Sequence, residues 1–372
     1  MAYKISGNIS SDVRIIIFKE DNYTIESNNE IPSGSYEIIV NTGDKLIIAR
    51  TDDGEIIGYG AVIPEAFSAS GNNAVIGGGL IYTDSGVATD SISHLVISIT
   101  STAVDFGDLT MTRFHLRAVS NGSNDRCVFI AGLDSGSIDV NVMDYVTIST
   151  PGNATDFGDT TIAINSFGAT SNGTNNRGVF RTAGKDAYIH YITISSASNS
   201  NTFGDRLYAS AATAGESNGT NNRGVFAGGL DGPSFYNNIE YVTISSLGNA
   251  QEFGDLTQTR GYLCSVSNGT NNRGVFGGGY TGSVYSNVLD YITISSLGNA
   301  SDFGDLTEYH HVATGTSNKT NNKGLIISGT SSNFSPTPHN IVEYITISTA
   351  GNASDFTELM YKLYDHTATS NA

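Results

Sequence analysis

Residues 267–279 read S-N-G-T-N-N-R-G-V-F-G-G-G, and residues 290–307 read D-Y-I-T-I-S-S-L-G-N-A-S-D-F-G-D-L-T. Both stretches recur in step along the chain. Copies of the first begin at Gly71, in a decayed form, and at Ser120, Ser171, Ser217, Ser267 and Ser317. The aromatic residue of the second returns as Phe106, Phe157, Phe203, Phe253, Phe303 and Phe356. Six copies at a period of roughly 50 residues predict an array of similar units, as in propellers and solenoids.

Each copy is expected to form four short antiparallel strands. In the copy quoted above, the first strand ends at Ser267, the second is R-G-V-F-G-G-G, the third is L-D-Y-I-T-I-S and the fourth is F-G-D-L-T. Asn, Gly and Asp between these strands supply the positive φ angles and the side-chain hydrogen bonds that tight turns need. The sequence therefore predicts an all-β chain whose copies are the blades of a six-bladed β-propeller.

The end of the chain predicts how the ring closes. Residues 363–372 match residues 309–318, so the chain ends in the turn that follows a first strand, and the first copy begins in that same turn. We therefore expect the C-terminal strand to complete the first blade, which removes the open sheet edges of the array. Residues 66–70 are the alternative source of this strand.

Residues 1–64 carry no trace of the repeat. They contain short runs rich in Ile, Val and Tyr, separated by turn signals such as Pro32-Ser33-Gly34 and Asp52-Asp53-Gly54. This pattern predicts a small β-sandwich of the immunoglobulin-like or prealbumin-like kind. The expected domains are thus 1–64, the sandwich, and 65–372, the propeller.

Composition argues against several classes of partner. The formal net charge of −18 argues against a nucleic-acid partner, since binding to its phosphate backbone would need a basic patch. No segment approaches the ~20 consecutive apolar residues of a membrane span, and the N-terminus lacks the features of a signal peptide. We expect neither nucleic acid binding nor membrane insertion.

The glycine run Gly277 to Gly279, followed by Tyr291 and then Phe303, resembles the kelch repeat. The resemblance covers about residues 68–372 and implies a propeller, although it implies no particular partner. The chain departs from the kelch pattern because it has no Trp, and because the interval from Tyr291 to Phe303 is longer than the kelch spacing.

Near-identical copies of D-F-G-D-L-T and S-N-G-T-N-N-R stand behind a short segment that opens M-A-Y-K-I-S-G-N-I-S. Taken together, these features resemble virion proteins of tailed bacteriophages. The resemblance implies that the small β domain docks onto other virion proteins and that the propeller is displayed outward, as a capsid decoration or a tail or fibre appendage. It also implies assembly in the host cytoplasm and a final location in the virion.

The irregular segments of the repeat predict the binding face. In an up-and-down blade, the loop between the second and third strands and the crossing to the next blade lie on one face, and these are the segments that vary. Their aromatic residues offer flat stacking area with a polar handle, which suits a host-surface glycan or protein. The candidate ligand-binding residues are Phe235, Tyr236, Tyr280, Tyr285 and Tyr309.

Two charged positions recur with the repeat. The cations are Arg126, Arg177, Arg223, Arg273 and Lys323, and the anions are Asp108, Asp159, Asp205, Asp255 and Asp305. We expect a ring of structural pairs between them, because the planar guanidinium suits a buried carboxylate. Calcium binding by the repeated Asp is the alternative, although no local series of Asp residues supplies the six to eight oxygens that calcium takes. No cofactor and no other metal site is predicted.

No nucleophile, base and orienting group can be assembled from the spacing of residues, so the expected role is non-enzymatic. A glycan-active propeller enzyme and a cellular kelch-like interaction scaffold remain the two alternatives. D-F-G recurs at Asp105, Asp156 and Asp302. It is interpreted as architecture, because the chain has no kinase catalytic loop beside it.

Overall fold

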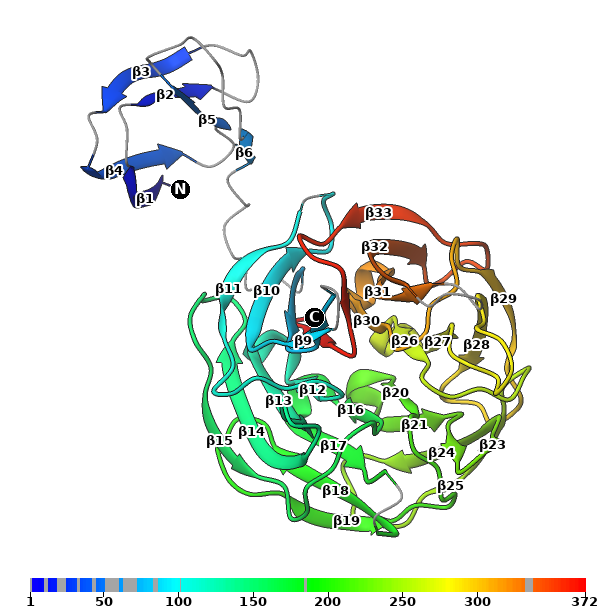
Figure 1. Cartoon of the computed structure of the whole chain (residues 1–372). Helices are drawn as coiled ribbons and strands as arrows, with labels where there is room; N and C mark the ends of the chain where they lie inside the picture. The colour runs from blue at the N-terminus through cyan, green and yellow to red at the C-terminus, as the bar shows by residue number, and fades with distance from the viewer. Residues whose placement is uncertain are drawn as a thin grey trace. The chain divides into compact units, whose positions relative to one another are not determined.

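The structure is a computed structural model of the chain (Figure 1). It describes the backbone of six strands within residues 2–62, and then residues 72–82, 86–100, 102–183, 186–331 and 337–372. The chain divides into two compact units, Met1–Ser68 and Ala69–Ala372. All elements of the described residues are strands or single 3-10 turns, as the composition predicts.

The first unit contains two antiparallel sheets. Strands β1 (Ala2–Ile9) and β4 (Gly34–Asn41) pair with each other, and the second sheet has the order β3-β2-β5-β6. Its strands are β2 (Val13–Phe18), β3 (Ile25–Ile31), β5 (Lys45–Arg50) and β6 (Gly60–Val62). The predicted sandwich packing depends on side chains that lie outside the described residues.

The second unit consists of six four-stranded antiparallel sheets, each of which runs from an inner strand to an outer strand. In that order, the first three are β35 (Thr367–Ser370), β7 (Asn73–Gly77), β10 (Ser91–Val96) and β11 (Val104–Asp108); β12 (Arg117–Ser120), β13 (Arg126–Leu133), β14 (Asp139–Thr147) and β15 (Thr155–Asp159); and β16 (Ala169–Ser171), β17 (Arg177–Arg181), β18 (Tyr188–Thr193) and β19 (Asn201–Asp205).

The remaining three sheets follow the same order. They are β20 (Ala214–Ser217), β21 (Arg223–Ala227), β24 (Asn238–Thr243) and β25 (Gln251–Asp255); β26 (Cys264–Ser267), β27 (Arg273–Gly277), β28 (Val288–Thr293) and β29 (Ser301–Asp305); and β30 (Thr314–Ser317), β31 (Lys323–Ser331), β32 (Thr337–Thr346) and β33 (Ser354–Glu358). Short strands on the loops are β8 (Leu80–Ile81), β9 (Val87–Ala88), β22 (Leu230–Asp231), β23 (Ser234–Phe235) and β34 (Leu363–Tyr364).

The six sheets form a ring. Each inner strand contacts the inner strands of the sheets on either side, and the outer strands lie at the periphery (Figure 1). The C-terminal strand β35 pairs antiparallel with β7, from Thr367 opposite Gly77 to Ser370 opposite Ala74. The alternative inner strand, residues 66–70, lies outside the described residues, but β7 is already paired on both sides. The arrangement is propeller-like, and the C-terminal strand completes the first sheet as the sequence predicts.

The recurring phenylalanine of the outer strand packs into the ring. Phe157 is buried and lies edge-on to Tyr145 of the third strand, with the ring centroids 6.1 Å apart. The glycine after it is required by the next sheet, because a Cβ atom on Gly254, for example, would lie 2.4 Å from the carbonyl oxygen of Gly298. The repeated F-G-D therefore lets the outer strand of one sheet touch the turn of the next.

The S-N-G-T-N-N turns join the sheets through a closed ring of side-chain hydrogen bonds. Each turn forms a 3-10 element, namely η1 (Gly122–Asn124), η2 (Gly173–Asn175), η3 (Gly219–Asn221), η4 (Gly269–Asn271) and η5 (Lys319–Asn321). Bonds of 2.8 to 3.1 Å run from Asn371 to Asp125, Asn121 to Asn176, Asn172 to Asn222, Asn218 to Asn272, Asn268 to Asn322 and Asn318 to Asn72. The uniform turns are thus architectural, because their asparagines link all six sheets.

The predicted pairing of the repeated cations with the repeated aspartates is wrong. Arg273 lies opposite Thr293 at the end of the third strand, whereas Asp305 lies opposite Val288 at its start, so the two charges sit at opposite ends of the sheet. Among the described residues, no ion pair joins Arg126, Arg177, Arg223, Arg273 or Lys323 to Asp108, Asp159, Asp205, Asp255 or Asp305.

Instead, each cation covers the tyrosine of its own sheet. The Cζ atom of Arg273 lies 4.5 Å from the ring centroid of Tyr291, and its Nη1 donates to the carbonyl oxygen of Ser348 in the next sheet at 2.9 Å. The same stacking occurs for Arg126, Arg177, Arg223 and Lys323. The repeated cation is therefore structural, but its partner is an aromatic ring.

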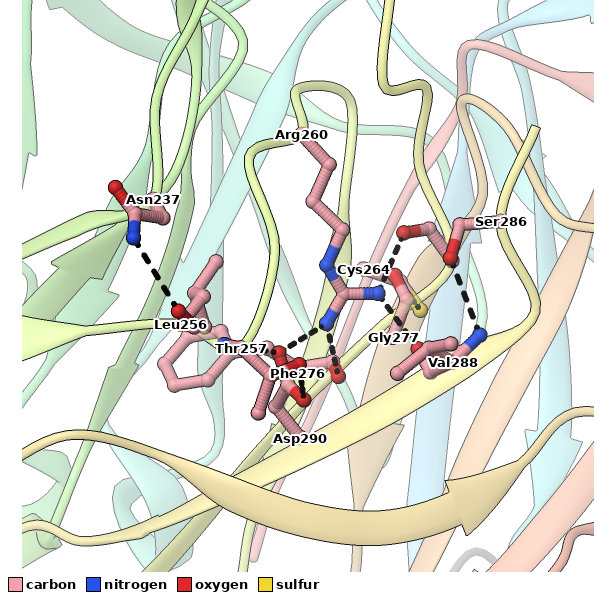
Figure 2. A network of polar contacts seen from close by, with 11 residues as sticks. Asn237, Leu256, Thr257, Arg260, Cys264, Phe276, Gly277, Ser286, Val288 and Asp290 are labelled. Carbon is pink, nitrogen blue, oxygen red and sulfur yellow. Dashed lines mark hydrogen bonds and ion pairs between the residues drawn. The ribbon is translucent and has the colours of Figure 1, made fainter. Parts of the chain in front are cut away.

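The buried ion pairs are made by other residues. Arg260, just before β26, lies 2.7 Å from Asp290 of β28, and both side chains are fully buried (Figure 2). Arg113 and Asp144 form the equivalent pair at 2.5 Å. In both pairs the aspartate directly precedes the tyrosine of the third strand, as Asp144 precedes Tyr145 and Asp290 precedes Tyr291. A single charged residue at this position of a largely apolar strand was the sequence signal for a buried ion pair.

Candidate functional site

The irregular loops gather on one face of the ring. Antiparallel pairing places the loop between the second and third strands, and the crossing to the next sheet, at the same edge of each sheet. We call this the loop face. Of the twelve large hydrophobic side chains that are exposed among the described residues, nine lie in or beside these loops: Tyr82, Val87, Ile138, Tyr188, Leu207, Val284, Tyr309, Met360 and Tyr361. Exposed apolar area is therefore concentrated where the copies differ in sequence.

A collar of six residues surrounds the centre of the loop face. One residue from each crossing, two or three positions before the inner strand, has a left-handed backbone with φ between 49° and 60°. The collar consists of His115, Ser166, Ala212, Tyr262, Val312 and Asp365. Backbone hydrogen bonds join five of the six neighbouring pairs of collar residues, as from the amide of Tyr262 to the carbonyl oxygen of Ala212 at 2.8 Å.

The left-handed backbone is costly for these residues. L-residues pay roughly 1–2 kcal/mol in this region, and a β-branched residue such as Val312 is unusual there. Another left-handed position of the repeat is held by glycine in three copies, as Gly78, Gly228 and Gly278, and by Ala131 and Ser328 in two others. Strain of this kind gathers at binding sites, so the side chains of the collar are candidates for function.

An aromatic cluster stands on one side of the collar. The loops carrying Phe235, Tyr280 and Tyr285 meet the crossings that carry Tyr262 and His311. Tyr285 and His311 are stacked with their centroids 4.8 Å apart, and Tyr280 lies edge-on to Phe235 at 5.5 Å. All five side chains are partly exposed.

The cluster and four of the six collar residues line a cavity of about 650 Å³, which we call the mouth. Its wall includes Phe235, Tyr262, Tyr280, Tyr285 and His311, and it also receives His115, Val312, Thr330, Tyr364 and Asp365. This volume lies within the range of small-ligand sites, which combine aromatic surface with a few polar groups.

Three of the five predicted ligand-binding residues are thus brought together, and two are not. Phe235, Tyr280 and Tyr285 line the mouth, whereas Tyr236 and Tyr309 do not. Tyr309 is 42% exposed on the outer part of the loop face, because it belongs to the start of a crossing and not to its inner end. Tyr262, His311 and the collar were missed; lining up the copies would have shown a variable position two or three residues before each inner strand.

The polar end of the mouth is built by a contact across the closure of the ring. His115 Nδ1 lies 3.1 Å from Asp365 Oδ1, and Ser166 Oγ lies 3.0 Å from the same ring nitrogen. Burial raises the pKa of Asp365 to about 7, although Arg117 beneath it acts in the opposite direction. Burial, together with Arg117 and His311, lowers the pKa of His115 to about 3.

At neutral pH the imidazole of His115 is therefore uncharged. The pKa of His311 is also lowered, to about 4, by burial. The mouth thus presents neutral imidazoles, phenol and alcohol hydroxyls, and a single carboxyl group. Ser166 and Asp365 compete for one nitrogen of His115, which differs from a Ser-His-Asp relay, where the two partners bond opposite nitrogens.

Below the collar the ring narrows. The inner strands, rich in Ser, Thr, Ala and Gly, enclose a channel of about 100 Å³ that holds Arg117 near the mouth, and Glu216 and Lys319 further along. Burial raises the pKa of Glu216 to about 7 and lowers the pKa of Lys319. The attraction between the two side chains acts against burial, because each charge favours the ionised form of the other group. The channel has room for a few water molecules only.

Within the described residues, no group of three or more His, Cys, Asp or Glu side chains is placed to bind a metal ion. The same part of the chain has no helix that could span a membrane. No family model matches the chain, and comparison with curated proteins finds no match.

Proposed function

We propose that this protein is a non-enzymatic structural protein of a tailed bacteriophage virion, serving as a capsid decoration or a tail or fibre appendage. In this proposal, the first unit is a β-sandwich that docks onto other virion proteins. The second unit is a six-bladed kelch-like propeller that displays the loop face to the host. The virion assignment rests on the resemblance of the repeats and of the N-terminal segment to such proteins.

The main observation in favour of a binding role is the mouth, the cavity of about 650 Å³ on the loop face. A scaffold of near-identical sheets, joined by uniform turns, supports a central cavity whose wall differs from copy to copy. A recognition site typically has a uniform framework that carries loops of variable sequence, and its lining often includes residues with a strained backbone. Half-buried Tyr280 and Tyr285, with neutral hydrogen-bonding groups nearby, suit a glycan of the host surface.

Two measurements test this proposal. Mass spectrometry of particles purified from cultures of the source should find the full chain at a constant ratio to the capsid protein; its absence from all particles would refute the virion role and favour a cellular scaffold. A glycan array probed with the full-length protein, followed by a reducing-sugar assay on each bound glycan, should detect binding without release of sugar. Release of sugar would favour the glycan-active enzyme.

A further inference from the structure

We propose that the mouth binds the uncharged terminal sugar of a glycan end-on, and that the collar side chains determine which sugar is accepted. This inference rests on the proposed binding role of the mouth and names its ligand class. It does not depend on the protein belonging to a virion.

End-on entry follows from the shape of the ring. The mouth holds about 650 Å³, but the channel below it holds only about 100 Å³ and is crowded by the inner strands. At Gly315, for instance, a single Cβ atom would lie 2.1 Å from the carbonyl oxygen of Ser265. A saccharide chain can therefore enter the mouth but cannot thread through the ring, so only one end of it reaches the collar.

The lining indicates an uncharged sugar. The rings of Phe235, Tyr262 and Tyr280 offer apolar area for the C–H face of a pyranose. The polar groups at the collar are Asp365, His115 and Ser166, with Thr330 and Ser283 on the wall. None of the described residues that line the mouth is a lysine or an arginine that could pair with an anionic sugar, and the nearest cation, Arg117, faces Asp365 from the channel side. Alcohol hydroxyls match these groups best.

The strain of the collar indicates that its side chains matter for recognition. A glycine would relieve the left-handed backbone at each position, yet all six collar residues carry a side chain. Tyr262 and Val312 both line the mouth, and Asp365 reaches His115 across the seam where the last strand meets the first sheet. The residue at the collar position differs from copy to copy, so the side chains at the base of the mouth are arranged asymmetrically. An asymmetric set of contacts can distinguish one sugar from another.

The test is calorimetric titration of the full chain with methyl glycosides of glucose, galactose, mannose, rhamnose and N-acetylglucosamine, and with glucuronic acid and N-acetylneuraminic acid as charged counterparts. At least one uncharged glycoside should bind, with a Kd on the order of 1 mM. Tyr262→Asn, which keeps a residue tolerant of the left-handed backbone, should weaken that binding about tenfold, as expected for the loss of one stacking ring.

Ala131→Gly is the matched control, because Ala131 also has a left-handed backbone (φ 49°) but does not line the mouth. It should leave the Kd unchanged. Both variants should retain a cooperative melting transition, which separates loss of binding from loss of fold. The proposal is overturned if no uncharged glycoside binds up to about 50 mM, if a charged sugar binds more tightly, or if Tyr262→Asn binds as the parent does. Sugar binding by a protein that is absent from particles would refute the virion role alone.

Discussion

Replacement of Arg260 by Met should destabilise the ring strongly. The Arg260 guanidinium donates to the carbonyl oxygens of Gly278 and Val288 through Nη1, at 2.8 and 2.6 Å, and to Asp290 through Nη2 at 2.7 Å (Figure 2). Neither side chain is exposed to solvent. Methionine would fill much of the volume but would leave a buried carboxylate with Thr257 as its remaining partner.

Removal of one partner from a buried pair costs about 3–5 kcal/mol. Unfolding entropy of about 2.1 cal/mol/K per residue, over the roughly 300 residues of the second unit, converts 4 kcal/mol into a fall in melting temperature of about 6 °C. The assays are thermal melting and urea unfolding, both followed by tyrosine fluorescence, since the chain has 19 Tyr and no Trp. Arg273→Met is the control, because Arg273 is partly exposed and its loss leaves no buried charge unpaired: it removes the stacking on Tyr291, worth about 0.5–1 kcal/mol, and the hydrogen bonds to the carbonyl oxygens of Ile347 and Ser348.

The variants Asp290→Leu and Arg260→Met with Asp290→Leu complete a double-mutant cycle. The double variant should be more stable than the sum of the single losses predicts, by at least about 2 kcal/mol, because it buries no unpaired charge. A coupling energy below about 0.5 kcal/mol would mean that the two groups act independently. Equal losses of stability for Arg273→Met and Arg260→Met would instead refute the idea that burial of the ion pair makes Arg260 costly to replace.

Three further predictions concern the collar, the channel and the closing strand. Ala212→Gly should cost about 1–2 kcal/mol less than Ala214→Gly in urea unfolding, because both alanines are buried but only Ala212 has a left-handed backbone; equal losses would contradict strain at the collar. Glu216 has a folded pKa of about 7, above its unfolded value of about 4.3, so the fold favours its protonated form and this contribution to stability is lost as pH rises. Relative to Glu216→Gln, the parent chain should therefore lose stability between about pH 4.3 and 7, and parallel stability curves would exclude this titration. Deletion of residues 367–372 removes β35 and should sharply lower the melting temperature, whereas an unchanged melting curve would show that the first sheet does not need the strand.

Much of the fold could be predicted because it is encoded locally. The repeat fixed the number of units, and the Asn and Gly residues of each turn fixed where the strands end. The match between residues 363–372 and 309–318 was enough to predict that β35 completes the first sheet. In these cases the information lies within one copy, or in the comparison of one copy with the next.

The errors and omissions concern side chains whose neighbours lie far away in the sequence. Recurrence of both charges predicts that the repeated cations pair with aspartates, yet the direction of the strands puts Arg273 and Asp305 at opposite ends of one sheet. Of the five aromatic residues predicted to bind ligand, Phe235, Tyr280 and Tyr285 reach the mouth because their loops fold inward. Recurrence alone therefore identifies important positions without identifying their partners.

An all-β array of six repeated four-stranded units, closed by its last strand, could be predicted from the sequence, because short-range periodicity and turn chemistry specify strands and their ends. The site could be found only in the folded ring. His115 and Asp365 meet because ring closure brings the crossing before β12 next to the crossing before β35, and left-handed backbone at the collar becomes visible only in three dimensions. A pattern along one strand carries no record of such contacts, since they depend on the curvature of the whole ring.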